Sequence, residues 1–307
     1  MRTPLTATLI LFGFLCGVPL WPDNSARPDW LLLEQGNAYF ARKEFGQALQ
    51  LYKEAIVEAG AFPEAEMAIG DIYVEEGEYE LARMQYEKAY NQRNAFNVPL
   101  QKYDVLYRLA RLHENKENYR TMEDVLQLIV AGDKRFTDSS NSRLKVQIEK
   151  NYFEKGLDQV LRLYRFETSF ANAAHSKLGW FYYRTGRFSK SVTHYLYAII
   201  YRMSEISAFQ HEQDVDFEFV TLGDSLKEAE RNKDLSQYIA DIDLFKDLYY
   251  LAGATYSLGY PQHSVMLWKL ISGSKNGGKF IELARRQIKK PWIEPFIVAA
   301  TKTKIKH

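Results

Sequence analysis

The feature that most constrains this chain is an internal repeat. Residues 32–56 read LLEQGNAYFARKEFGQALQLYKEAI, and residues 66–90, EMAIGDIYVEEGEYELARMQYEKAY, align with them without a gap. The aligned pairs are Gly36 with Gly70, Tyr39 with Tyr73, Phe45 with Tyr79, Ala48 with Ala82, Tyr52 with Tyr86 and Ala55 with Ala89. One unit of this size cannot bury an apolar face alone, so repeated units have to stack on one another.

The order of these residue types resembles the tetratricopeptide repeat (TPR), a helix–turn–helix unit of about 34 residues. The spacing from Gly36 to Gly70 matches that length. The resemblance implies an all-α fold, a right-handed superhelical solenoid of antiparallel helix pairs. Gly36 and Gly70 stand where the two helices of a pair approach closely, since a side chain there would push them apart. Tyr39, Tyr52 and their counterparts Tyr73 and Tyr86 are expected to fill the space between the stacked units.

Weaker copies of the pattern follow, at residues 106–130 and 175–200, and a degenerate copy at 142–165 fills the interval between them. We therefore expect TPR-like repeats over residues 27–203, at about 30–61, 63–95, 104–135, 140–168 and 173–203. Residues 204–290 are expected to form a helical C-terminal extension that caps the array. Within it, 261–272 and 280–290 read as a last helical pair. Residues 291–307 form a basic tail, predicted to be solvated, with contact to an anionic membrane as the less favoured alternative.

Residues 1–22 resemble a signal peptide. Arg2 precedes the apolar run LTATLILFGFLCGVPLW, and the polar stretch PDNSARPD follows it. Because a spanning helix needs about 20 apolar residues, the run is at the lower limit for a membrane anchor. Cys16 adds lipidation as a third outcome, although Leu15 stands where lipoprotein signals have a small residue. All three outcomes predict an exported or membrane-associated protein of the cell envelope.

Composition argues against several classes of function. With 40 basic and 39 acidic residues the formal net charge is +1, whereas nucleic-acid binders usually carry a basic excess. One cysteine allows no intramolecular disulfide and no cysteine-rich zinc site. The six histidines lack metal-ligand spacing, and no nucleophile motif is present. We expect no metal, no cofactor and no enzymatic activity.

One stretch, GSKNGGKF at residues 273–280, has the glycine and lysine spacing of a phosphate-binding loop. Such a loop follows a buried strand, and its lysine precedes a serine or threonine that holds magnesium. Here the preceding residues have helical periodicity, and Phe280 follows Lys279. The stretch is therefore interpreted as a turn between two helices.

In TPR proteins the first helices of the repeats line a concave surface that binds partners. The resemblance places these residues on that surface: Trp30, Leu33, Asn37, Phe40, Met67, Asp71, Tyr107, Arg111, Trp180, Tyr183 and Arg184. Aromatic residues and arginine are enriched at binding hot spots. The set is apolar enough to mark a binding surface, or alternatively a surface that C-terminal helices cover.

Chaperone-binding TPR proteins grip a C-terminal carboxylate with five Lys, Asn and Arg residues. Of these positions only Asn37 and Arg108 match here, while Leu33, Ala68 and Asp104 occupy the others. Asp104 would repel a carboxylate, so the ligand is not expected to be an acidic chain terminus. The sequence thus predicts a scaffold that binds another protein, in an envelope or membrane complex. The alternative is a binding protein for a hydrophobic small molecule or lipid that works with a transporter.

Overall fold

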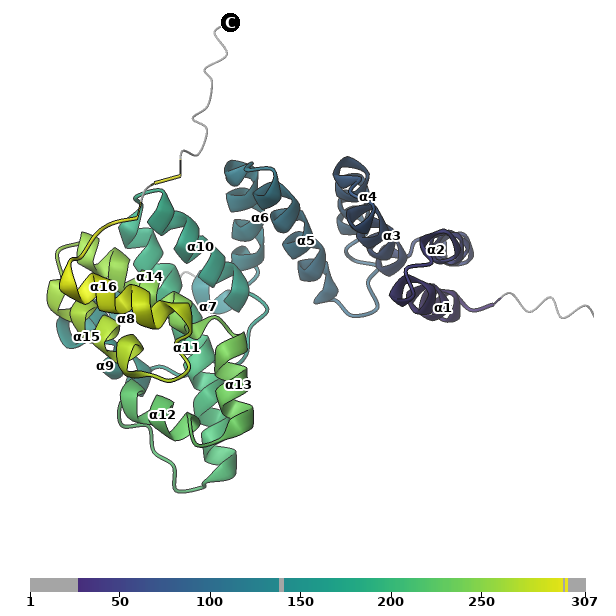
Figure 1. The fold of residues 1–307 in the computed structure, drawn as a ribbon. Coiled ribbons are helices and arrows are strands. Elements are labelled where there is room, and N and C mark those ends of the chain that lie inside the picture. Colours follow the sequence, from purple (N-terminus) through teal and green to yellow (C-terminus); the bar gives the residue numbers. More distant parts are fainter. Residues whose placement is uncertain (1–26, 138–140, 295, 298–307) are drawn as a thin grey trace, which may run out of the picture. The chain divides into compact units, whose positions relative to one another are not determined.

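The structure is a computed structural model that describes residues 27–137, 141–294 and 296–297 (Figure 1). These residues form sixteen helices and no strand, which confirms the predicted all-α class. None of the described helices is long and apolar enough to span a membrane. The leader with Cys16 and the tail after residue 297 lie outside the described residues, so what was predicted for them stays a prediction.

The chain divides into two compact units, residues 1–60 and 61–307. The described part of the first unit is one helix pair, α1 (Asp29–Ala41) and α2 (Phe45–Ala59). The buried ring of Tyr52 lies on Gly36, where an added Cβ would be 2.4 Å from Tyr52 Cε1. The Tyr52 hydroxyl donates a 2.8 Å hydrogen bond to Asn37 Oδ1. The packing of this pair therefore requires a residue without a side chain, Gly36, opposite the Tyr52 ring.

The second unit contains the other fourteen helices. They are α3 (Pro63–Glu75), α4 (Tyr79–Asn91), α5 (Gln101–Asn115), α6 (Tyr119–Ala131), α7 (Lys134–Thr137), α8 (Asn141–Lys155), α9 (Leu157–Leu163), α10 (Asn172–Arg184), α11 (Phe188–Gln213), α12 (Leu222–Ala229), α13 (Lys233–Asp241), α14 (Leu244–Ser257), α15 (Pro261–Gly273) and α16 (Lys279–Lys289). The pairs α3–α4, α5–α6 and α10–α11 are the TPR-like repeats that the sequence predicts.

The glycine–tyrosine contact recurs in the second unit. A Cβ on Gly70 would lie 2.4 Å from Tyr86 Cε1, and one on Gly179 would lie 2.9 Å from the ring of Tyr195. Both rings are fully buried. The same contact, at the same spacing, shows that these pairs share one packing mode, and it confirms the TPR-like fold.

The structure contains a further TPR-like pair, α14–α15, that the sequence did not predict. It aligns with α10–α11 without a gap, with Gly259 on Gly186 and Trp268 on Tyr195. Both of these glycines have positive φ in the turn between their helices. Ala252 replaces the helix glycine of the motif, which hid the pair. The predicted pairing of 261–272 with 280–290 is also present, because α15 packs against both α14 and α16.

The degenerate copy at 140–168 does not stack between its neighbours, so that expectation was wrong. Instead α10 packs directly on α6, where Gln127 Nε2 donates to the Tyr182 hydroxyl at 2.6 Å and Arg187 pairs with Glu123 at 2.7 Å. Helices α8 and α9 pack against α11. The physical reason is length, since α9 has only seven residues and cannot serve as the second helix of a repeat.

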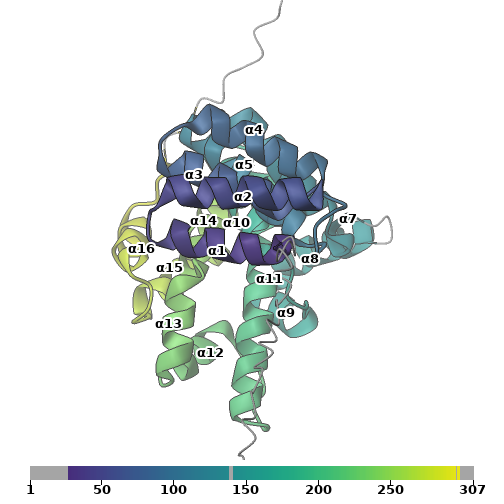
Figure 2. The ribbon, with the colours of Figure 1, turned by 90° about the vertical axis from the view of Figure 1, so that its right-hand side faces the viewer.

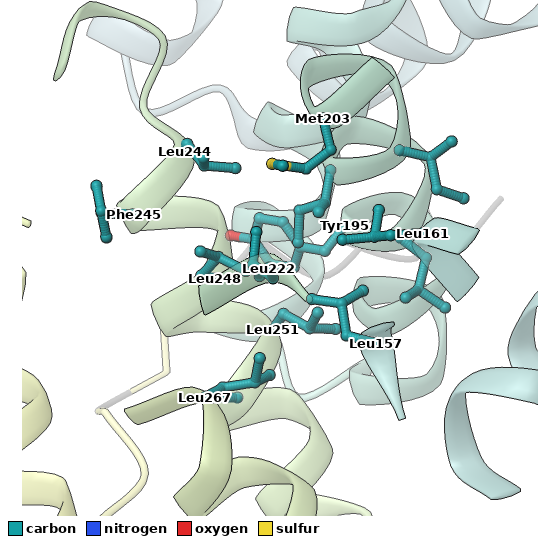
Figure 3. Close-up of a cluster of buried hydrophobic side chains, with 14 of the residues drawn as sticks. Leu157, Leu161, Tyr195, Met203, Leu222, Leu244, Phe245, Leu248, Leu251 and Leu267 are labelled. Carbon is teal, nitrogen blue, oxygen red and sulfur yellow. The ribbon is translucent and has the colours of Figure 1, made fainter. Parts of the chain in front are cut away.

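The predicted boundary at residue 203 falls inside α11, which runs without a break for 26 residues. Its C-terminal half extends beyond the repeat and lies beside α12 and α13 (Figure 2). A large apolar cluster joins α11 to α9, α12, α14 and α15, with Tyr195, Met203, Leu222 and Leu251 among its members (Figure 3). The extension and the last repeat therefore share one core.

The tail prediction is wrong for the residues that the structure describes. Residues 291–297, without residue 295, run from α16 onto the end of α10 (Figure 1). The N–H of Trp292 donates to Gln287 Oε1 at 2.9 Å, and Gln287 Nε2 donates to the carbonyl of Trp292 at 3.0 Å. The N–H of Ile297 donates to the carbonyl of Arg184 at 2.8 Å. We call this segment the C-terminal strap.

Substitution of Gly36 by alanine tests the packing mode. We expect Gly36→Ala to destabilise the first helix pair by about 1–3 kcal/mol, because the methyl group overlaps the buried Tyr52 ring. Gly46→Ala is the matched control, since nothing lies within 4 Å of its added Cβ. That control should leave stability unchanged or raise it by up to about 1 kcal/mol. Amide hydrogen exchange of α1 and α2 measures both, and equal effects would contradict the packing account.

Candidate functional site

A groove of about 440 Å³ lies between α5 and α10, the first helices of two adjacent repeats. Its lining residues are Asp104, Tyr107, Arg108, Ala110, Arg111, Glu114, Leu126, Ala173 and Lys177. We call it the α5–α10 groove. Two residues of the predicted binding surface, Tyr107 and Arg111, line it.

Tyr107 is fixed within the wall of the groove. Its hydroxyl donates to the carbonyl of Phe170 at 2.7 Å and accepts from the N–H of Ala174 at 2.9 Å. Burial raises the pKa of this phenol above its ordinary value, so it stays neutral. Tyr107 thus ties α5 to the start of α10 and offers a partner its ring rather than its hydroxyl.

Most charges of the groove are already paired across helices. Arg108 binds Asp71 of α3 with two hydrogen bonds of 2.8 and 2.9 Å, the two-pronged geometry that makes arginine–carboxylate pairs specific. Lys177 of α10 pairs with Glu114 of α5 at 2.7 Å. These pairs link neighbouring repeats, so Asp71 has a structural role in addition to the binding role predicted for it.

Within the described residues, Arg111 differs from Arg108, Glu114 and Lys177 of the groove in having no ion pair or hydrogen bond to its side chain. In the preceding repeat the equivalent residue, Asp71, accepts a 2.6 Å hydrogen bond from the Tyr86 hydroxyl. In this repeat Leu126 stands in place of that tyrosine, so the second helix of the same pair offers Arg111 no hydroxyl at this position. Among the described residues its guanidinium, which is exposed, has neither an ion pair nor a hydrogen bond. It is available to a ligand.

The predicted residues of α10 do not line the groove, whose α10 residues are Ala173 and Lys177. Trp180 is half-buried, with Lys177 and Arg184 within 5.9 and 5.7 Å of its ring. Tyr183 is buried, contrary to its predicted place on an open surface. The reason is Gly253 of α14, whose missing side chain lets that helix approach to where a Cβ would lie 2.9 Å from the Tyr183 ring.

The remaining predicted residues belong to α1 and α3. Trp30 is 59% exposed, and Leu33, Phe40 and Met67 are half-buried. Phe40 packs on Phe45, with ring centroids 5.6 Å apart. Asn37 holds the Tyr52 hydroxyl, as described above. That these residues bind a partner stays a prediction.

Two buried histidines form a pair that the sequence did not reveal. His175 of α10 and His194 of α11 face each other with their Nδ1 atoms 3.0 Å apart. Burial lowers the pKa of His175 to about 3 and the pKa of His194 well below its ordinary value. Both rings are therefore neutral, one donating and the other accepting. Their spacing along the chain fits no ligand motif, and only the packing of α10 on α11 brings them together.

A buried ion pair lies on the α14 side of α10. Asp247 Oδ2 is 2.7 Å from Arg202 Nη1, and Asp247 Oδ1 accepts a 2.5 Å hydrogen bond from the hydroxyl of Ser176. Burial raises the pKa of this carboxyl to about 6, against the opposing effect of Arg202. The three residues join α10, α11 and α14, which fixes the position of the α10 face that borders the groove.

A larger cavity, of about 940 Å³, lies along the C-terminal half of α11. Phe166, Phe209, Phe217 and Phe219 line it together with Arg135 and Arg165. The guanidinium of Arg165 lies over Phe219 at 5.0 Å. This cavity belongs to the helical extension rather than to the repeats.

The loop-like stretch at residues 273–280 joins α15 to α16, as the sequence interpretation requires. The carboxylate of Glu230 accepts from the Lys275 N–H at 2.7 Å and from the Ser274 hydroxyl at 3.0 Å. The Ser274 hydroxyl and the Lys275 N–H of this turn thus already donate hydrogen bonds to a carboxylate of the protein. In the described part of the chain, no three His, Cys, Asp or Glu side chains lie close enough to hold a metal ion.

Comparison with known proteins gives distant relatives. No protein-family model matches the chain. An uncharacterized protein of Borreliella burgdorferi is 22% identical over 92% of this chain and 97% of its own length. An uncharacterized protein of Treponema pallidum is 21% identical over 66% of this chain, which spans 54% of that relative. Among solved structures, YrrB, described as a TPR protein with an unusual peptide-binding site, aligns with 83% of this chain and 90% of its own, at 12% identity and a TM-score of 0.43.

The histidine pair predicts how stability depends on pH. The pKa values of His175 and His194 are lower in the folded chain than the ordinary value of about 6.5. On acidification these two histidines therefore bind protons at a higher pH in the unfolded chain than in the folded chain. Stability is therefore lost as the pH falls below about 6.5, by about 2 kcal/mol for His175 between pH 7.5 and 5. The raised pKa of Asp247 acts in the opposite direction and offsets part of this loss.

Urea unfolding at pH 7.5 and pH 5 measures the effect. His175→Gln should make the loss on acidification smaller than in the wild type, whereas His211→Gln, at an exposed position on α11, should leave it unchanged. The same pH dependence in all three proteins would show that the buried pair does not control it.

Proposed function

We propose that this protein is a non-enzymatic scaffold that binds an extended segment of a partner protein in the α5–α10 groove. The observation that carries the proposal is Arg111, an exposed guanidinium without a partner among the described residues, in a groove where most other charges are paired. A repeat array holds such a groove open without any ordering of the chain, which lowers the entropic cost of binding. The TPR-like fold supports the same function.

The chemistry of the groove indicates what it would bind. The sequence suggested an apolar surface, but Tyr107 in the groove and Trp180 beside its Lys177 are half-buried, and the groove residues that remain open are mainly charged. An extended polar segment fits these groups better than a hydrophobic small molecule does, provided that its carboxylate side chain lies at Arg111, two helical turns from Asp104. Paired charges such as Lys177 with Glu114 add selectivity, because a like charge placed against either partner is unfavourable.

The second candidate function is the binding of a hydrophobic small molecule or lipid. One feature favours it, the four phenylalanines of the larger cavity along α11. Glu212 and the two arginines also line that cavity, so a purely apolar ligand would leave their charges in contact with hydrocarbon. We therefore rank this function second.

We further propose that the scaffold works in the cell envelope. Support comes from the sequence of residues 1–22 alone, with its positive start and apolar run. The N-terminal peptide of the protein purified from its native host should begin near or after Cys16, or the full chain should be retained in the membrane fraction. Mass spectrometry and fractionation measure this. A full-length chain recovered entirely from the cytosol would contradict the placement.

A photo-crosslinking amino acid at Ala173, exposed in the groove, tests the binding function in the native host. We expect a discrete protein adduct, detected by mass spectrometry. Arg111→Glu should reduce its yield about 10-fold, equivalent to about 1.4 kcal/mol of affinity. Arg120→Glu, an equally exposed charge change on α6, is the matched control and should leave the yield unchanged.

Two results would contradict the proposal. Equal adduct yields in the Arg111 and Arg120 variants would remove Arg111 from the site. A bound lipid or small molecule without any protein adduct would favour the second candidate function.

A further inference from the structure

The C-terminal strap contacts α10, one of the two helices that carry the proposed site. From Trp292, where Gln287 holds its backbone, the strap passes Tyr250 of α14 and reaches Arg184 at the end of α10. Arg184 is one of the residues that the sequence placed on the binding surface, and it follows Lys177 and Trp180 along α10. Lys177 lines the groove, and Trp180 lies between it and Arg184, so the strap contacts α10 just beyond the end of the groove.

The strap is held mainly through its backbone and one carboxylate. The N–H of Glu294 donates to the Tyr183 hydroxyl at 3.3 Å, and that of Ile297 donates to the Arg184 carbonyl. The Glu294 carboxylate is 3.6 Å from Arg184 and accepts a 3.5 Å hydrogen bond from Tyr250. This is how an extended peptide from another molecule would bind, with main-chain hydrogen bonds for position and one charged side chain for selectivity.

The contacts are weaker than those that hold the rest of the unit together. The distances to the Glu294 carboxylate are long for charge-assisted bonds, which are usually about 2.7–2.9 Å. Burial raises the pKa of Glu294, so its charged form is not fully compensated. Trp292, Ile293 and Phe296 remain 37%, 44% and 56% exposed. Ile297 packs on the core and Phe296 lies 6.2 Å from Phe188, but three of the four apolar side chains stay largely open, so a competing segment could displace the strap.

We infer that the strap is an intramolecular occupant of the ligand-binding face, and that the partner segment displaces it from Arg184. The inference rests on the proposed function and adds the regulation and the ligand chemistry of the same site. The matching ligand is an extended segment with a carboxylate side chain between apolar residues, as Glu294 stands between Ile293 and Phe296. The wild-type chain is then partly closed to such a segment, and release of the strap opens it.

A synthetic peptide with the sequence of residues 288–297, IKKPWIEPFI, serves as the probe in a fluorescence-anisotropy titration of the full-length protein. Wild type should bind it weakly, because the same sequence already occupies the face. Glu294→Arg places like charges opposite each other at Arg184, which should release the strap and tighten peptide binding at least 10-fold. Gln287→Ala loosens the strap at its other anchor and should act in the same direction.

Specificity is checked by a charge exchange. In a Glu294→Ala protein, whose strap carries no charge that could pair with residue 184, the further change Arg184→Glu should abolish binding of the peptide, and a peptide with arginine in place of its glutamate should restore it. Circular dichroism establishes that each variant is folded. If both releasing variants are folded and neither tightens binding relative to wild type, the strap is only a structural brace and the inference is overturned.

The two proposals fail separately. Crosslinking at Ala173 reports whether a partner uses the groove, whereas the peptide titration reports whether the strap closes the adjacent face. A partner adduct whose yield is the same in wild type and Glu294→Arg would overturn the inference and leave the proposed function standing.

Discussion

The contact between a glycine of the first helix and a tyrosine ring of the second is the interaction on which the repeats depend. It sets the distance within a pair, as at Gly70 and Tyr86, and it places the tyrosine hydroxyl at the next residue of the first helix. There Asp71 accepts it. The candidate site arises where this pattern is interrupted, because Leu126 carries no hydroxyl and leaves Arg111 without a partner among the described residues.

Helix α10 lies between the core of the second unit and the candidate site. One side is covered by α14, where Ser176 meets the buried pair of Asp247 and Arg202. The other side borders the groove through Ala173 and Lys177. Through the hydrogen bond of Ser176, this buried ion pair ties α10 to α11 and α14.

The fold class and the regular helix pairs could be predicted because glycine and tyrosine recur at a fixed spacing. The pair α14–α15 could not, since Ala252 and Trp268 preserve its packing while changing the residue types. The burial of Tyr183 depends on Gly253, which lies far away in the chain, and no local pattern reports such a contact. For the same reason no pattern distinguishes Arg111 from the other predicted surface residues, because its freedom depends on a leucine in another helix.

Hydroxyl-radical footprinting of the purified chain, with and without the partner captured by crosslinking, tests the central claim most directly. Oxidation of side chains is read by mass spectrometry at each residue, so the two candidate surfaces are compared in one experiment. The account predicts that the partner protects Tyr107 and Trp180 while Phe209 and Phe217 keep their reactivity. Protection of the two phenylalanines, with Tyr107 and Trp180 unchanged, would place the partner on the C-terminal half of α11 and contradict the account.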